Sequence, residues 1–133
     1  MSKTRIQYPG LDAAARPMGP APLSPALMAG NMLFVSGQVG IDPMTGTVVG
    51  PDIESQTRQT LENLKALVEA AGLTLDDVVK TNVFVTDVGN FPAMNAVYRQ
   101  YFAEPFPARS TVGIALANSD LLVEIEAIAI KGT

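Results

Sequence analysis

The hydrophobic positions of the chain change period several times, and each change marks a new element. Residues 32–39 form a mostly apolar run that predicts a buried strand. Residues 78–86 predict a second strand, because valine and threonine alternate there with other residues. Residues 109–116 and 121–130 predict two further strands, separated by a turn at residues 117–120. These runs form the sheet expected for this chain.

Two stretches instead repeat their apolar residues at the spacing of a helix. Asp52 is a suitable N-terminal cap, and Gly72 a suitable end, for a helix with one apolar stripe made of Ile53, Thr57, Leu61, Leu64, Val68 and Ala71. A second helix begins at residue 91, with one face marked by Phe91, Met94, Tyr98 and Tyr101. Pro105 and Pro107 end it.

The N-terminal third is less regular. Residues 1–25 are rich in proline, glycine and alanine, which predicts an irregular arm with a short strand near residues 4–8. Residues 29–31 are a turn signal. Residues 42–46 read DPMTG, typical of a hairpin turn, and predict a short return strand at residues 47–49.

This order of elements predicts an α+β domain. The 133 residues suit a single domain, residues 1–133, in which two helices cover one face of a single mixed sheet. The last strand places valine, isoleucine and alanine on one side, and Glu124, Glu126, Ile128 and Ile130 on the other. A sheet face that mixes acids with large aliphatic residues favours contact with another chain, so we expect an oligomer.

Composition excludes several kinds of chemistry. The chain has no cysteine and no histidine, which removes disulfides, thiol nucleophiles, Ser-His triads and the commonest metal ligand. Its net charge of −4 and lack of a basic stripe argue against nucleic acid as a partner. No apolar run is long enough to span a membrane, and no secretory signal is visible, so a cytoplasmic protein is expected.

Two charged residues stand where the pattern favours burial. Arg109 lies between a proline-bounded turn and an apolar run, and Glu124 lies inside the last strand. A buried charge is costly unless it is paired or used, so the simplest interpretation is that the two residues face one cleft. Arginine matches a carboxylate with its planar fork, and glutamate can hold and polarise a water. The pair predicts a small acidic substrate and a hydrolytic step.

Six blocks of the sequence together resemble one known family. Residues 106–112 read FPARSTV and residues 122–129 read LVEIEAIA; residues 30–38, 59–64, 79–85 and 94–98 read GNMLFVSGQ, QTLENL, VKTNVFV and MNAVY. With this spacing, from about residue 22 to residue 131, the chain resembles the reactive intermediate deaminase family (Rid, also called YjgF).

The resemblance implies a chorismate-mutase-like fold and a homotrimer with clefts between neighbouring subunits. It also implies hydrolysis of enamine or imine intermediates such as 2-aminoacrylate to a 2-keto acid and ammonia, without a metal or an organic cofactor. By position, Arg109 matches the carboxylate-binding arginine and Glu124 the water-positioning glutamate. Residues that line or shape the cleft are matched by Ser36, Gly37 and Asn95, and backbone groups near Ser110 and Thr111 would orient the imine nitrogen.

The chain departs from the best-studied branch at two positions. Leu23 stands where that branch has a tyrosine, and Thr111 where it has a cysteine. The arginine and the glutamate are retained, so the chemistry is expected to persist while the choice of substrate stays open.

Plainer roles compete with these assignments. Arg109 could form a structural ion pair, Ser36 could close its strand, and Asn95 could support a loop. Glu126 shares its strand face with Glu124, so either acid could be the one that merely pairs with a cation. At the level of the whole protein, the alternatives are a non-catalytic trimer that binds small keto or amino acids and, less favoured by the acidic charge, a ribonuclease or translation inhibitor.

Overall fold

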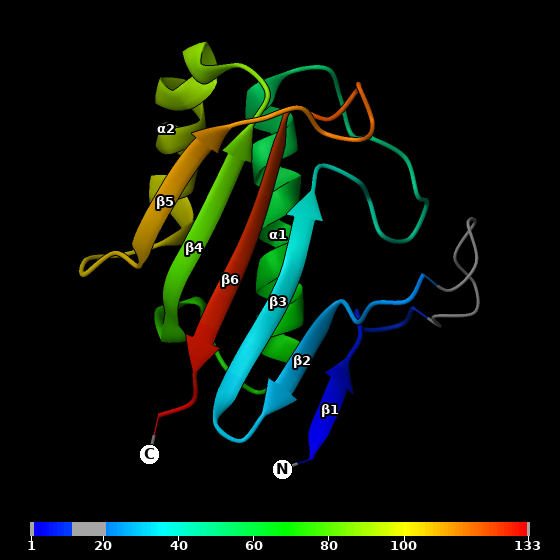
Figure 1. The fold of residues 1–133 in the computed structure, drawn as a ribbon, viewed down its shortest axis with the longest axis vertical. Helices are drawn as coiled ribbons and strands as arrows, with labels where there is room; N and C mark the ends of the chain where they lie inside the picture. Colours follow the sequence, from blue (N-terminus) through cyan, green and yellow to red (C-terminus); the bar gives the residue numbers. More distant parts are fainter. Residues whose placement is uncertain (1, 12–20, 133) are drawn as a thin grey trace.

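The computed structural model describes residues 2–11 and 21–132, in which six strands form one sheet. The strands are β1 (Lys3–Ile6), β2 (Ala26–Ala29), β3 (Met32–Val39), β4 (Val78–Val85), β5 (Ala108–Gly113) and β6 (Val123–Ile130). They lie side by side in the order β1-β2-β3-β6-β4-β5 (Figure 1). Neighbours are antiparallel except β4 and β5, which are parallel, so the sheet is mixed as predicted.

Two helices, α1 (Ile53–Ala70) and α2 (Phe91–Tyr101), cover one face of this sheet and leave the other open (Figure 1). The short 3₁₀ helices η2 (Leu75–Asp77) and η3 (Val88–Asn90) flank β4. The α+β layout with both helices on one face is therefore confirmed. In residues 2–11 and 21–132 no helix is long and apolar enough to cross a membrane.

The first helix begins and ends at the residues that the sequence indicates. The Asp52 carboxylate accepts the Ser55 backbone N–H at 2.8 Å, and this hydrogen bond lowers the pKa of Asp52. Such a cap satisfies one of the free N–H groups of the first turn. Gly72 follows the helix with φ +84°, a left-handed conformation that glycine adopts without strain.

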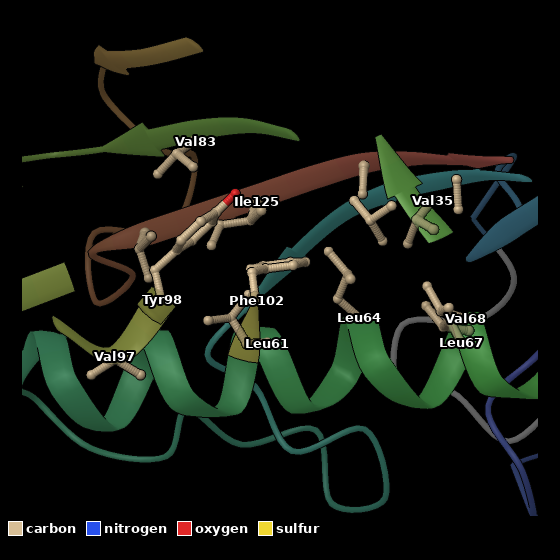
Figure 2. Packing of buried hydrophobic residues seen from close by; sticks show 14 of the residues in the cluster. Val35, Leu61, Leu64, Leu67, Val68, Val83, Val97, Tyr98, Phe102 and Ile125 are labelled. Atoms are coloured by element: carbon tan, nitrogen blue, oxygen red, sulfur yellow. The ribbon is translucent and has the colours of Figure 1, made fainter. Parts of the chain in front are cut away.

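The core lies between α1 and the sheet. Figure 2 shows Leu61 and Leu64 pointing from α1 towards the strands, with Val83 and Ile125 above them. All four are fully buried. At about 1.5–3 kcal/mol for each buried aliphatic side chain, this layer supplies much of the stabilisation that fixes the sheet on the helix.

Two expectations for the N-terminal half need correction. Residues 26–29 form β2, which pairs with both β1 and β3, although the sequence suggested no strand there. Residues 47–49 do not form a return strand, because only one bridge, between Ile41 and Val48, connects the two sides of the turn. Part of the predicted arm, residues 12–20, lies outside the described residues, while the short strand expected near residues 4–8 is confirmed as β1.

The C-terminal strands are shorter than predicted, and β4 carries a bulge. β5 ends at Gly113 rather than at residue 116, and β6 begins at Val123 rather than at residue 121. On β4 the register shifts between Val78 and Lys80, so Val78 is buried while Val79 is 44% exposed. Strict alternation would place Val79 on the core side together with Thr81, Val83 and Val85. The bulge instead puts Val78 on the core side and Val79 in solvent.

Candidate active site

Arg109 lies on the helix-covered side of the sheet. On β5 it is in register with Thr81 of β4, whose buried side chain faces α2. The guanidinium carbon of Arg109 lies 4.9 Å from the centre of the Tyr98 ring, in a cation–π arrangement. Stacking of this kind fixes the plane of the guanidinium and leaves its edge free to meet a carboxylate.

Tyr98 is a rigid platform for this arginine. Tyr98 is 4% exposed, the centre of its ring lies 4.6 Å from that of the Phe102 ring, and its hydroxyl shares a 2.8 Å hydrogen bond with the Thr81 hydroxyl. Burial raises the pKa of Tyr98, while Thr81 and the Arg109 charge act in the opposite direction. The phenol therefore stays neutral at ordinary pH, and the platform holds its position.

A cleft of about 210 Å³ opens beside Arg109. It is lined by α2 and by the segment that leads into β5, through Asn95, Tyr98, Arg99, Phe106, Pro107 and Arg109. Two of these residues are arginines and none is acidic. The Asn95 Oδ1 atom is buried and has no hydrogen-bond partner. Such a lining suits a small anion that also donates a hydrogen bond.

Glu124 lies on the opposite, open face of the sheet. Its neighbours on β6 are buried under the helices, and across the sheet it is in register with Val39 and Phe84. Burial raises the pKa of Glu124, and the nearby charge of Glu126 raises it further. A carboxyl with a raised pKa can exchange a proton near neutral pH more readily than an ordinary glutamate.

Gly37 makes room for the Glu124 side chain. A Cβ atom built on Gly37 would lie 2.6 Å from the Glu124 Cδ atom, which is too close unless the Glu124 side chain moves. The register of β3 against β6 shifts between Val35 and Gln38, so Ser36 and Gly37 form a β-bulge opposite Glu126, two residues along β6 from Glu124. The close approach thus explains the glycine in physical terms.

Ser36 supports the bulge from the other side. Its hydroxyl donates to the Ser24 carbonyl at 2.6 Å, and its backbone N–H donates to the Pro25 carbonyl at 2.9 Å. Both contacts tie the bulge to the segment before β2. Within one chain the Ser36 hydroxyl is therefore engaged structurally, the plainer of the two roles considered for it.

Ser110 and Thr111 follow Arg109 on β5 and point to alternate sides. Ser110 is in register with Asn82 on the open face, where the Lys80 ammonium donates to the Ser110 hydroxyl at 3.1 Å. Thr111 is in register with the buried Val83, and therefore lies on the same side as Arg109.

Within one chain, then, the predicted site residues form two groups. Arg109, Asn95 and Thr111 lie on the helix-covered side, and Glu124, Gly37, Ser36 and Ser110 lie on the open side. The expectation that Arg109 and Glu124 face one cleft is wrong for a single chain, because the sheet stands between them. The two strands β5 and β6 are separated by β4, which alone adds about 10 Å between their backbones.

A larger cleft, of about 630 Å³, opens along β1, β2 and β3. Its lining includes Leu23, Ser36, Glu126 and the two cations Lys3 and Arg5. The Arg5 guanidinium donates to the Leu23 carbonyl at 3.2 Å, so the chain segment that carries Leu23 is held at the wall of this cleft. Leu23, the position of the first departure, therefore lies close to the bulge.

Sequence reasoning missed four residues of the arginine cleft. Tyr98 was assigned only to the apolar face of the second helix; it is buried there, but its ring also contacts Arg109. Arg99, Phe106 and Pro107 were not considered as part of a site. A signal existed, since Tyr98 and Arg99 follow Asn95 by three and four residues and so share its helix face. In the described ranges no group of three potential metal ligands comes together.

The chain is thus an α+β domain with an arginine cleft on one face of its sheet and a half-buried glutamate on the other. Comparison with known proteins then gives the family. The family model described as Endoribonuclease L-PSP matches residues 13–131. A 2-iminobutanoate/2-iminopropanoate deaminase of Salmonella typhimurium is 48% identical over 118 residues, which cover 84% of this chain and 91% of that protein.

Two further relatives agree. A RutC family protein of Pyrococcus horikoshii is 52% identical over 118 residues, covering 89% of this chain and 92% of that protein. The crystal structure of the Escherichia coli YjgF gene product matches with a TM-score of 0.84 at 42% identity, covering 97% of this chain and 99% of that one. The chain therefore belongs to the YjgF/RutC/Rid family, as its sequence blocks predicted.

Proposed function

We propose that this protein hydrolyses 2-imino acids, or the enamines in equilibrium with them, to 2-keto acids and ammonia. The observation that carries the proposal is the Arg109 cleft. The Arg109 guanidinium is stacked on Tyr98 there, and no residue that lines the cleft carries a carboxylate. The name of the Salmonella relative, a 2-iminobutanoate/2-iminopropanoate deaminase, supports the same reaction.

In the proposed reaction Arg109 holds the substrate carboxylate through two hydrogen bonds. Glu124 takes a proton from a water as the water oxygen attacks the imine carbon, and returns a proton to the nitrogen. The C–N bond of the resulting carbinolamine then breaks, so one imine and one water give one keto acid and one ammonia. Imines hydrolyse unaided, so positioning and one acid–base group, worth ~10²–10⁴-fold, are sufficient.

Because the sheet separates Arg109 from Glu124 in one chain, the proposed site combines two copies. Arg109 of one subunit would face Glu124 and the Gly37 bulge of its neighbour. A cyclic trimer contains three such contacts and closes without a free end, and the partly apolar open face is a suitable contact surface. That face carries Phe34, 41% exposed, and Val112, 45% exposed.

Mixed assemblies test this arrangement. We expect Arg109→Lys and Glu124→Gln each to lose ammonia release, and the two variants to recover it when they are coexpressed with different affinity tags and purified through both. Every trimer purified through both tags contains both variants, and one of its three sites then pairs an intact arginine with an intact glutamate, so about a third of the wild-type activity is expected.

The complementation experiment can fail in informative ways. If doubly tagged assemblies form but stay as inactive as the single variants, each site is contained in one chain and the two-copy arrangement is wrong. If the wild type releases no ammonia from any imine tested, the deaminase proposal itself falls. Light scattering of the wild type at micromolar concentration should give about three times 14.0 kDa, and a monomer would contradict the trimer.

A second candidate function is a non-catalytic binder of small keto or amino acids. It is favoured by the observation that the Arg109 cleft is complete within one chain, without Glu124. A binder would hold a keto acid equally well with glutamine at position 124 and would accelerate no hydrolysis. Calorimetric binding together with ammonia release separates the two functions.

A further inference from the structure

The Arg109 cleft contains a second cation for which the proposed reaction has no use. Arg99, in the last turn of α2, lines the same 210 Å³ as Arg109, and no acidic residue lines it with them. The chain as a whole has 13 acidic and 9 basic residues. The cleft is therefore locally positive, with two arginines and no acidic residue in its lining, although the protein as a whole carries a net negative charge.

A simpler role for Arg99 is stabilisation of its helix. A cation in the last turn interacts favourably with the carbonyl end of a helix, an effect of about 0.3–1 kcal/mol at an exposed site. Any outward-facing position in that turn would serve this purpose. The helix effect explains why a cation is present, but not why its side chain lines the wall next to Arg109.

The two arginines are also held differently. Both side chains are exposed, but Arg109 is stacked on the buried Tyr98 ring, whereas no such ring contact holds Arg99 in the part of the chain that the structure describes. A fixed arginine suits the carboxylate next to the reacting carbon, which must be placed accurately. An exposed arginine without such a contact suits a second anionic group at the far end of the substrate, whose distance from the first carboxylate changes with chain length. Phe106, 40% exposed, offers an apolar wall to the carbons between them.

We propose that this cleft selects 2-imino acids that carry a second carboxylate, the imines of 2-keto diacids, with Arg99 as the specificity-determining residue. The inference rests on the deaminase function proposed above and narrows its substrate class. Substrates with two negative charges would gain a second charge-assisted hydrogen bond that 2-iminobutanoate cannot make.

The experiment compares two substrates and three variants. Imines are generated in situ from aspartate or glutamate and from 2-aminobutyrate, and the ratio of the kcat/KM values for diacid and monoacid is measured. We expect the wild type to favour the diacid, and Arg99→Gln to lower that ratio roughly 10-fold, the effect of one charge-assisted hydrogen bond at a solvent-accessible site. Arg99→Lys should keep part of the preference, since its charge remains.

Arg58→Gln is the matched control. Arg58 lies on α1, where its guanidinium donates to the side chain of Gln100 at 2.9 Å, outside the cleft lining. This variant removes the same charge close to α2, so it should leave the diacid-to-monoacid ratio unchanged. If Arg58→Gln and Arg99→Gln lower the diacid-to-monoacid ratio equally, the effect comes from the net charge of the protein rather than from Arg99, and the proposal is overturned.

Binding of the products distinguishes failure of this inference from failure of the deaminase function. By calorimetry, 2-oxoglutarate should bind the wild type more tightly than 2-oxobutanoate, and Arg99→Gln should remove most of the difference. If this holds while no imine is hydrolysed, the diacid cleft stands and the enzyme proposal fails. If ammonia is released but Arg99→Gln leaves both the ratio and the binding difference unchanged, or if the wild type has no diacid preference, the diacid inference is wrong.

Discussion

The two faces of the sheet carry the two halves of the candidate site in different ways. On the helix-covered face, Arg109 rests on Tyr98, which is itself fixed by Thr81 and by the α2 packing. On the open face, Glu124 lies over the Gly37 bulge, with no helix above it. The first half is built on core packing, and the second on a local break in strand pairing.

This difference teaches which half depends on assembly. The arginine cleft is lined by residues of one chain alone, so we expect it to bind a carboxylate without assembly. Glu124 is half-buried within one chain, and its environment would become drier if another subunit covered the open face. The burial that already raises the pKa of Glu124 would then act more strongly. Assembly is thus expected to matter more for proton transfer than for binding.

The largest effect is expected from the arginine half. Arg109→Lys should lower kcat/KM by roughly 10³-fold, because lysine is a point charge that loses both the two-bond grip on the carboxylate and the placement of the imine carbon. Arg58→Lys, the same substitution on the exposed side of α1, should retain full activity. Near-normal turnover by Arg109→Lys, with an unchanged circular dichroism spectrum, would show that the carboxylate is held elsewhere.

The open-face half should show a smaller effect, confined to turnover. Glu124→Gln keeps the size of the side chain but cannot relay a proton, so kcat should fall roughly 10²-fold while 2-keto acid binding survives. Glu126→Gln removes the same charge two residues along the same strand face and should cost much less. Equal losses in the two variants, measured by ammonia release and calorimetry, would deny Glu124 a special role and favour the binder.

The sequence predicted the fold well where patterns are local. The first helix, with its Asp52 cap and Gly72 end, depends only on neighbouring residues and was placed within one residue. β2 was missed because the strand is only four residues long and follows a proline-rich segment. Its pairing with β1 also joins residues that are distant in sequence. Strand ends and the Val79 bulge likewise depend on the register between strands, which a single strand's pattern does not contain.

For the candidate site, the sequence indicates which residues to consider but not how they are arranged in space. Arg109 and Glu124 carry visible signals, since each is a charge within an apolar context. Whether they share a face depends on which residues of β4 they pair with. Arg109 is opposite Thr81 and Glu124 is opposite Phe84, and these two residues of β4 point to opposite faces of the sheet. A shift of one residue in either pairing would reverse the answer, so alternation along the separate strands could not decide it.

A still smaller effect tests the fit between Gly37 and Glu124. Gly37→Ala places a Cβ against the Glu124 carboxyl group, which must move, so kcat should fall roughly 10-fold through misplacement of the acid. The double variant Gly37→Ala/Glu124→Gln should lose little beyond Glu124→Gln alone, because the two changes act through the same group. Strictly multiplicative losses would mean that Gly37 acts on the substrate or on the strand rather than through Glu124.

The smallest effect concerns stability and its dependence on pH. The folded protein raises the pKa of Glu124 above the ordinary value of 4.5, mainly by burial and then by the charge of Glu126. The folded state therefore holds this proton more tightly than the unfolded state, and stability falls as pH rises from about 4.5 through the folded pKa. Glutamine does not ionise, so Glu124→Gln should escape this loss and be the more stable protein at neutral pH, while the advantage disappears below pH ~4.

The expected gain is below about 1 kcal/mol, since solvent screens a carboxylate that is only partly buried. Denaturant midpoints of the wild type and Glu124→Gln at about pH 4 and pH 7.5 would measure it. Glu126→Gln should gain stability only because it removes the repulsion between the Glu124 and Glu126 charges. Comparison of the two variants therefore separates the effect of that repulsion from the effect of Glu124 burial. A stability difference between Glu124→Gln and the wild type that is the same at both pH values would show that the carboxyl titrates alike in the folded and unfolded chains. The open face would then offer Glu124 no special environment within one chain, and the proposed role of Glu124 in proton transfer would depend entirely on a neighbouring subunit in the proposed assembly.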